Sequence, residues 1–178
     1  MFGLGRKISP LIAAADSLHD WAVSQSRAPA LYREMGAPDT VEGRFEMLTL
    51  HVLLLMDRLK GGAAADLALR QHLFDRYISH LDGAMREMGV GDLAMGKRMR
   101  ALGEAFYGRA KAYDLALAAL PQRGELESLI ARTALAHAPA ASARALAGHV
   151  VDCRAGLALC TDAALLAGSV DDSAETTS

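Results

Sequence analysis

Aromatic residues are scarce in this chain: they make up 5% of its 178 residues, although 52% of the residues are hydrophobic. Much of the hydrophobic content is alanine. The strands of β-sandwiches are rich in aromatic and β-branched side chains, which this composition does not supply. The composition therefore favours closely packed helices, and the length is sufficient for one domain with a substantial core.

A strong positive charge is also missing. The chain has 19 basic and 21 acidic residues, which gives a net charge of −2 at pH 7. Proteins that bind DNA attract its phosphates with a basic surface, so we expect no DNA partner.

Only two cysteines are present, Cys153 and Cys160. On one helix they would lie about 10.5 Å apart along the axis, too far for a disulfide, so we expect reduced, buried thiols in a cytoplasmic protein. No cysteine and histidine spacing typical of a metal site is apparent, and no two histidines have the spacing of an HExxH helix. No Cys–His pair is expected either. The sequence predicts no metal ligand, no cofactor and no catalytic residue.

Long apolar runs are absent as well. The most apolar stretch, residues 146–166, is interrupted by charged side chains and a histidine, and does not predict a membrane span. The basic and apolar residues at 1–8 do not resemble a secretory signal. Together with Trp21 they either dock on the domain or lie on a membrane surface.

Helical periodicity is what the sequence does contain. We expect a single all-α, bundle-like domain of six or seven helices over residues 1–168, followed by a disordered acidic tail over 169–178. Proline and glycine mark most helix boundaries. The expected helices cover residues 9–26, 29–35, 40–60, 64–88, 92–120, 124–137 and 140–167.

The segment Thr40–Lys60 is expected to be the central and most buried helix. Asp39 or Thr40 can cap its start, and Gly61-Gly62 can end it. Its apolar residues form two faces, so the helix should pack against neighbours on two sides. One face holds Val41, Phe45, Leu48, Val52, Leu55 and Leu59, the other Met47, Leu50 and Leu54. The polar back holds Glu42, Glu46, Thr49, Asp57 and Lys60.

Between the two apolar faces lie Arg44, His51 and Arg58, each seven residues from the next. Either carboxylates of the bundle, such as Asp75, Asp82 or Asp114, satisfy the arginines, or these side chains form the polar floor of a groove that holds another protein's segment. The residues alone leave both interpretations open.

The helix expected from Asp92, with Asp92 as its cap, has two further features. Gly96, Gly103 and Ala110 form a line of small residues that indicates close approach by a neighbouring backbone. The helix is also the most basic segment, either as a solvated face or as a contact for ribosomal RNA or anionic lipid. Its basic residues are Lys97, Arg98, Arg100, Arg109 and Lys111.

One spacing hints at an enzyme. Asp16 and Asp20 form a DxxxD pair, by which isoprenoid synthases hold magnesium and diphosphate. Such enzymes need a second cluster and a longer chain. A small helical enzyme or binder for an isoprenoid or other apolar ligand is therefore the alternative hypothesis, and a solvated face or helix start is the simpler interpretation.

Two stretches carry a family likeness. The first, residues 31–59, contains a PDT–GRFE–LHV run, and the second, residues 71–117, contains a Met-Gly-Val-Gly-Asp turn, a KRM step and a Phe-Tyr-Gly-Arg…Ala-Tyr end. Together they resemble the ubiquinol–cytochrome c chaperone family. The resemblance implies an all-α, non-enzymatic chaperone that binds newly made cytochrome b during assembly of the cytochrome bc1 complex. We expect a bacterial member that acts from the cytoplasm, with the ribosome or the inner-membrane surface as further contacts.

We expect the client to bind between the central helix and the long helix after Asp92. Methionines suit such an adaptable surface, although they also fill gaps in cores. The candidate client-binding residues are Arg44, His51, Arg58, Lys97, Arg98, Tyr107, Arg109 and Tyr113.

Overall fold

The computed structural model describes residues 9–60, 64–135 and 138–170, which form helices and no strand. The all-α prediction is confirmed. The helices are α1 (Pro10–Ser26), α2 (Pro29–Arg33), α3 (Val41–Arg58), α4 (Ala64–Glu87), α5 (Asp92–Ala118), α6 (Gly124–Arg132), α7 (Ala140–Leu159) and α8 (Asp162–Leu166). The single helix expected over 140–167 is two helices, because Cys160 has an extended backbone.

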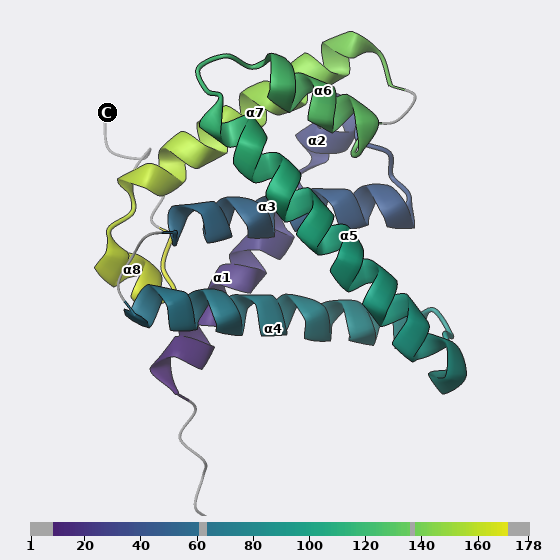
Figure 1. The fold of residues 1–178 in the computed structure, drawn as a ribbon, viewed down its shortest axis with the longest axis vertical. Coiled ribbons are helices and arrows are strands. Elements are labelled where there is room, and N and C mark those ends of the chain that lie inside the picture. The colour runs from purple at the N-terminus through teal and green to yellow at the C-terminus, as the bar shows by residue number, and fades with distance from the viewer. Residues whose placement is uncertain (1–8, 61–63, 136–137, 171–178) are drawn as a thin grey trace, which may run out of the picture.

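Helix α3 lies at the centre of the molecule (Figure 1). Helices α1, α4, α5 and α7 all contact it, and α6 packs on α5 and α7. In Figure 1, α5 crosses in front of α3, and its N-terminal end meets the end of α4 at the lower right, away from α1, α7 and α8. The central position predicted for this helix is therefore confirmed.

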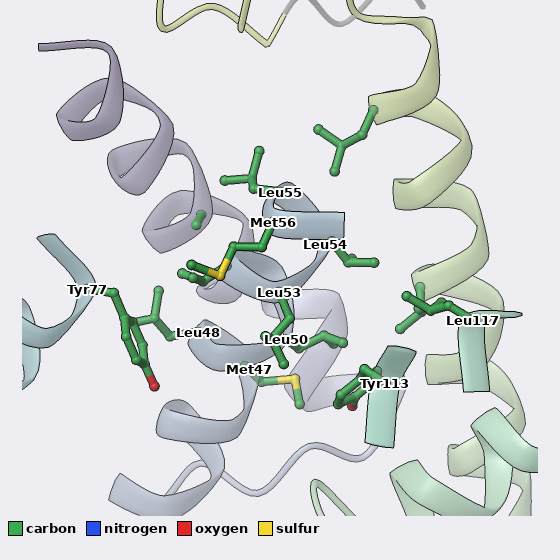
Figure 2. Close-up of a cluster of buried hydrophobic side chains, with 14 of the residues drawn as sticks. Met47, Leu48, Leu50, Leu53, Leu54, Leu55, Met56, Tyr77, Tyr113 and Leu117 are labelled. Carbon is green, nitrogen blue, oxygen red and sulfur yellow. The ribbon is translucent and has the colours of Figure 1, made fainter. Parts of the chain in front are cut away.

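The middle of α3 is buried on every side. Each residue from Met47 to Met56 is at most 9% exposed. Figure 2 shows its Met and Leu side chains between Tyr77 on one side and Tyr113 and Leu117 on the other. The start of the helix differs, since Val41 is 58% exposed although we expected it on an apolar face.

The polar back predicted for α3 is wrong over much of its length. Thr49 is buried, and its hydroxyl lies 2.7 Å from the Tyr77 hydroxyl. The side chains of Glu46 and Asp57 are 12% and 15% exposed, and both form ion pairs. The partners come from three different helices, Tyr77 from α4, Arg109 from α5 and Arg154 from α7, which a pattern of apolar residues cannot reveal.

The turn into α3 explains the PDT–G spacing. The Gly43 N–H donates to the Thr40 side chain at 3.1 Å, so Thr40 is the cap. Asp39 instead accepts from Arg44 Nε at 2.7 Å. A Cβ on Gly43 would lie 1.9 Å from the carbonyl oxygen of Pro38, so this approach requires glycine. The expected end signal, Gly61-Gly62, lies outside the described residues.

The turn between α4 and α5 follows the sequence prediction at one end only. Gly89 has φ +81°, and the Val90 N–H donates to the Met85 carbonyl at 3.0 Å, as expected for a helix that ends at glycine. At the start of α5, however, Gly91 is the cap, and Asp92 is the first helical residue. The carboxylate of Asp92 accepts from Arg86 at 3.1 Å and is not available to cap.

The close backbone approach expected along α5 is also wrong. A Cβ added to Gly96 or Gly103 would meet no atom of the described residues within 4 Å. Figure 1 shows the N-terminal end of α5 reaching past α3 toward the end of α4.

The described structure includes only part of the two chain ends. Residues 1–8, which carry most of the proposed membrane contact, and residues 171–178 of the expected tail lie outside the described residues. The first tail residues are ordered on the domain: the Ser169 N–H donates to the Ala164 carbonyl at 2.9 Å, and Val170 packs against the core.

Candidate functional site

The two stretches that carry the family likeness meet at an ion pair between α3 and α5. Arg109 Nε and Nη2 donate to the two carboxylate oxygens of Glu46 at 3.0 and 2.7 Å. This bidentate geometry joins the GRFE segment to the Phe-Tyr-Gly-Arg segment. Phe106 is buried beside this contact, and its ring lies 5.1 Å from the rings of both Phe74 and Tyr77. Much of the likeness therefore serves to hold α3, α4 and α5 together.

A pocket opens where these three helices meet, and we call it the three-helix pocket. Its volume is about 370 Å³. Leu67 and Tyr107 stand at its edge and are 55% and 64% exposed. Its lining residues are Leu53, Met56, Asp57 and Lys60 from α3 and the turn after it, Leu67, Arg70, Gln71 and Phe74 from α4, and Phe106, Tyr107, Ala110 and Asp114 from α5.

Polar groups in this pocket are only partly satisfied. Lys60 forms ion pairs with Asp57 and Asp114 and so connects the end of α3 to α5. The buried Nε of Arg70, by contrast, has no hydrogen-bond partner among the described residues. A buried donor without a partner is rare in folded proteins, and this one is closed to solvent although Arg70 lines the pocket.

A second pocket of about 410 Å³ lies between α3 and α7, and we call it the α3–α7 pocket. Its arginines already have partners. Arg154 Nε donates to Asp57 at 2.8 Å, and Arg58 donates to the carbonyls of Leu157 and Cys160 and to Asp162. These bonds fasten α7 and α8 to the end of α3.

The predicted line of Arg44, His51 and Arg58 does not form one groove floor in the described structure. Arg44 is exposed and binds Asp39 at the start of α3. His51 is fully buried, and Arg58 binds the α7–α8 turn. The arginine partners are Asp39, Asp162 and Glu46 rather than the expected Asp75, Asp82 and Asp114.

The other candidate residues all lie on α5 but in different surroundings. Tyr107 is exposed at the three-helix pocket, whereas Tyr113 is buried, and burial raises the pKa of its hydroxyl. Lys97 and Arg98 are exposed on the first half of the helix. No described residue forms an ion pair with either of them.

The structure contradicts the expectation that no Cys–His pair exists. His149 Nε2 lies 3.4 Å from Cys153 Sγ and 3.2 Å from His51 Nε2. One ligand atom from each of these three residues lies within 4.8 Å of the others, a spacing that can hold a metal ion. His149 and Cys153 are four residues apart on α7, which places them on one face and was the missed signal. His51, from the distant α3, could not be assigned to this cluster from sequence.

The electrostatics of the cluster favour neutral imidazoles. Burial lowers the pKa of His51 to about 4, although its bond to the Met47 carbonyl opposes this shift, and His149 lowers the pKa further. Burial also lowers the pKa of His149, against the opposing charge of Asp152. Neutral imidazole is the form that binds metals.

The aspartates of the enzyme hypothesis are not arranged as a metal site in the described structure. Asp16 accepts from Arg76 Nε at 2.9 Å, which connects α1 to α4. Asp20 is exposed, 3.8 Å from His19 Nδ1. Neither belongs to a group of three possible metal ligands among the described residues.

The fold is an all-helical domain with two surface pockets against its central helix. The model of the ubiquinol–cytochrome c chaperone family matches residues 33–173. The chain is also similar to the crystal structure of the Cbp3 homolog from Brucella abortus, with 35% identity and a TM-score of 0.79 over 90% of this chain and 88% of that one. A comparison with curated proteins gives no match. The chain belongs to the ubiquinol–cytochrome c chaperone family, and the resemblance inferred from its sequence is confirmed.

Family membership assigns the chain a chaperone role. None of the described helices has the length and apolar character needed to cross a membrane.

Proposed function

We propose that this protein is an assembly chaperone that binds newly made cytochrome b during biogenesis of the cytochrome bc1 complex. Three observations support the proposal: membership of the family, a pocket that stands open to a partner, and exposed apolar residues around it. The protein acts from the cytoplasm at the surface of the inner membrane, where cytochrome b is inserted.

The three-helix pocket is the surface that carries this proposal. Its walls are apolar, with Phe74, Phe106 and Leu67 facing the space that a client side chain would fill. A membrane protein such as cytochrome b presents apolar helices before assembly, and such a helix binds through anchor side chains that enter a groove. Arg70 and Gln71 add polar groups to the lining of this pocket.

The exposed edge of the pocket sets it apart from the α3–α7 pocket. Tyr107 and Leu67 stand at the edge of the three-helix pocket, and large exposed apolar residues mark interaction sites when they gather in one place. In the α3–α7 pocket, the arginines are engaged in fastening α7 and α8. The client therefore binds between α3 and α5, where the sequence led us to expect it, and also contacts α4, with Tyr107 as its main contact among the candidate residues.

The basic first half of α5 is the second part of the proposed surface. Lys97, Arg98 and Arg100 are exposed and have no ion-pair partner among the described residues. They face the anionic lipid surface while the pocket holds the client, which predicts binding to anionic vesicles that weakens with salt. Salt-independent binding would assign the contact to the apolar residues instead, and association with ribosomes but not vesicles would assign it to ribosomal RNA.

The test is a gene deletion complemented with variants in the organism that carries the gene. Deletion should reduce assembled bc1 complex and leave other respiratory complexes unchanged. The double variant L67A/Y107A removes two exposed side chains at the pocket and should not restore the complex. The control is Leu159→Ala on α7, since Leu159 is 72% exposed but does not line the pocket.

Each outcome bears on a different part of the proposal. Normal bc1 levels after deletion would contradict the chaperone function itself. Full rescue by L67A/Y107A, at the same protein level as the control, would contradict only the proposed binding site. The chaperone function would stand, but the client would not bind in the three-helix pocket.

A further inference from the structure

The His51, His149 and Cys153 cluster lies outside the three-helix pocket, and the chaperone proposal does not use it. It joins the centre of α3 to the middle of α7. Two imidazoles and a thiol come from parts of the chain about a hundred residues apart. Three donor atoms that meet at one point can bind a ligand together, whereas a cysteine buried alone in a core only fills space.

The distances within the cluster are those between ligands that share one ion. Two nitrogens at about 2.0–2.1 Å from a tetrahedral zinc lie roughly 3.3 Å apart, and a nitrogen and a thiolate at about 2.3 Å lie roughly 3.6 Å apart. The corresponding distances here are 3.2 Å from His51 Nε2 to His149 Nε2 and 3.4 Å from His149 Nε2 to Cys153 Sγ. An ion therefore fits with small side-chain movements.

The orientation of His51 also suits a metal ligand. Its Nδ1 lies 2.8 Å from the Met47 carbonyl oxygen, which can only accept, so the proton resides on Nδ1. The lone pair of Nε2 then faces His149 and Cys153. Metal-binding histidines usually donate their second ring N–H to a carbonyl or carboxylate in this way, which fixes the tautomer and the ring.

We infer that His51, His149 and Cys153 bind a single zinc-class metal ion that ties α3 to α7. Imidazole and thiolate donors select zinc among the common divalent ions, and the three ligands leave a fourth position for water or another donor. His149 and Cys153 are only half-buried, which gives the ion a path from solvent. Binding releases the thiol proton of Cys153 to solvent, because the thiolate is the ligand.

The experiment is a metal titration of the full-length chain without a polyhistidine tag, reduced and treated with a chelator. Cobalt is the spectroscopic probe, and zinc is then added as competitor. We expect an equimolar amount of cobalt to bind with a thiolate-to-cobalt charge-transfer band, and zinc to displace it. The variants Cys153→Ser and His149→Gln should each weaken binding by about 100-fold, since each removes a direct ligand.

The control is Cys160→Ser, because Cys160 lies on the same segment and its thiol donates to the Gly156 carbonyl at 3.7 Å. It should bind cobalt as the unchanged chain does, and circular dichroism should show equal helix content in all four proteins. Three results would overturn the inference. These are no equimolar binding by the folded unchanged chain, unchanged cobalt affinity in Cys153→Ser or His149→Gln, or loss of the charge-transfer band in Cys160→Ser. Without equimolar binding, the 3.2 Å contact is a hydrogen bond between two neutral histidines.

Discussion

Helix α3 and the first half of α5 are both amphipathic by sequence, but they differ in how much of their surface is buried. The middle of α3 is buried on all sides, and its polar groups have partners within the protein, as the Glu46–Arg109 and Asp57–Arg154 pairs show. The first half of α5 is largely exposed, and Leu93 lies fully open to solvent. One helix holds the fold together, and the other presents a surface.

This difference separates residues that preserve the structure from residues available for a partner. A charged side chain that is already paired within the fold contributes to stability. It would have to break that ion pair before it could bind a client. Lys97 and Arg98 are different, because both are exposed and neither has an ion-pair partner among the described residues. Variants can test this separation directly, and the expected effects below decrease in size.

The largest effect should come from a leucine in α3. Leu50 is 1% exposed, so Leu50→Ala leaves a cavity and should lower the free energy of unfolding by about 2–5 kcal/mol. Leu93→Ala on α5 should change it by less than about 0.5 kcal/mol, because the side chain is fully exposed. Urea denaturation followed by circular dichroism measures both. Equal losses would show that the first half of α5 is packed against the domain.

The next effect separates two arginines that the sequence analysis grouped together. Arg109→Ala should lower the free energy of unfolding by about 2–3 kcal/mol, because it leaves the largely covered Glu46 carboxylate without its bidentate partner. Arg44→Ala should cause no measurable change, since both Arg44 and Asp39 are largely exposed. A stable Arg109→Ala protein would return Arg109 to the list of free client contacts.

A smaller effect depends on pH and on His19 in α1. His19 is fully buried between α1 and α4, and burial, with His80 and Arg76 adding to it, lowers its pKa to about 4, against the opposing charge of Asp20. The unfolded chain takes up this proton below about pH 6.5, and the folded chain does not until about pH 4. Stability is therefore complete above pH 6.5 and falls through this window, by about 2 kcal/mol at pH 5.

Denaturation at pH 7.5 and pH 5 measures this effect, with His19→Leu as the matched variant. The variant should lose less stability between the two pH values than the unchanged chain. An identical loss in both proteins would assign the acid sensitivity to other groups.

The sequence predicted the helices well because their boundaries depend on local chemistry. Gly89 ends α4 through its own backbone conformation, and Thr40 caps α3 through its own side chain. The sequence predicted partners poorly, because those depend on which helix covers which face. Thr49 and Glu46 look solvent-exposed until Tyr77 and Arg109 are brought against them, and His51 and His149 meet across 98 residues.

The candidate site also has a part that local sequence signals predict and a part that depends on helix packing. The apolar lines and arginines of α3 and α5 predicted a client surface between these helices. A pocket lies between them and α4, and client binding there stays a prediction. The contribution of α4 could not, because Leu67, Arg70 and Phe74 reach the pocket only through the packing of α4 on α3 and α5. The local signal of Gly96 and Gly103 was misleading, since no neighbour lies close to either glycine.

The central claim is that the client occupies the three-helix pocket, and photo-crosslinking in cells tests it most directly. A photoreactive residue replaces Tyr107 at the pocket in one strain and Leu159 on α7 in another, since both side chains are well exposed. In cells making bc1 complex, we predict a crosslink to cytochrome b from position 107 and none from position 159. A crosslink to cytochrome b from position 159 alone, with both proteins at equal levels, would contradict the account.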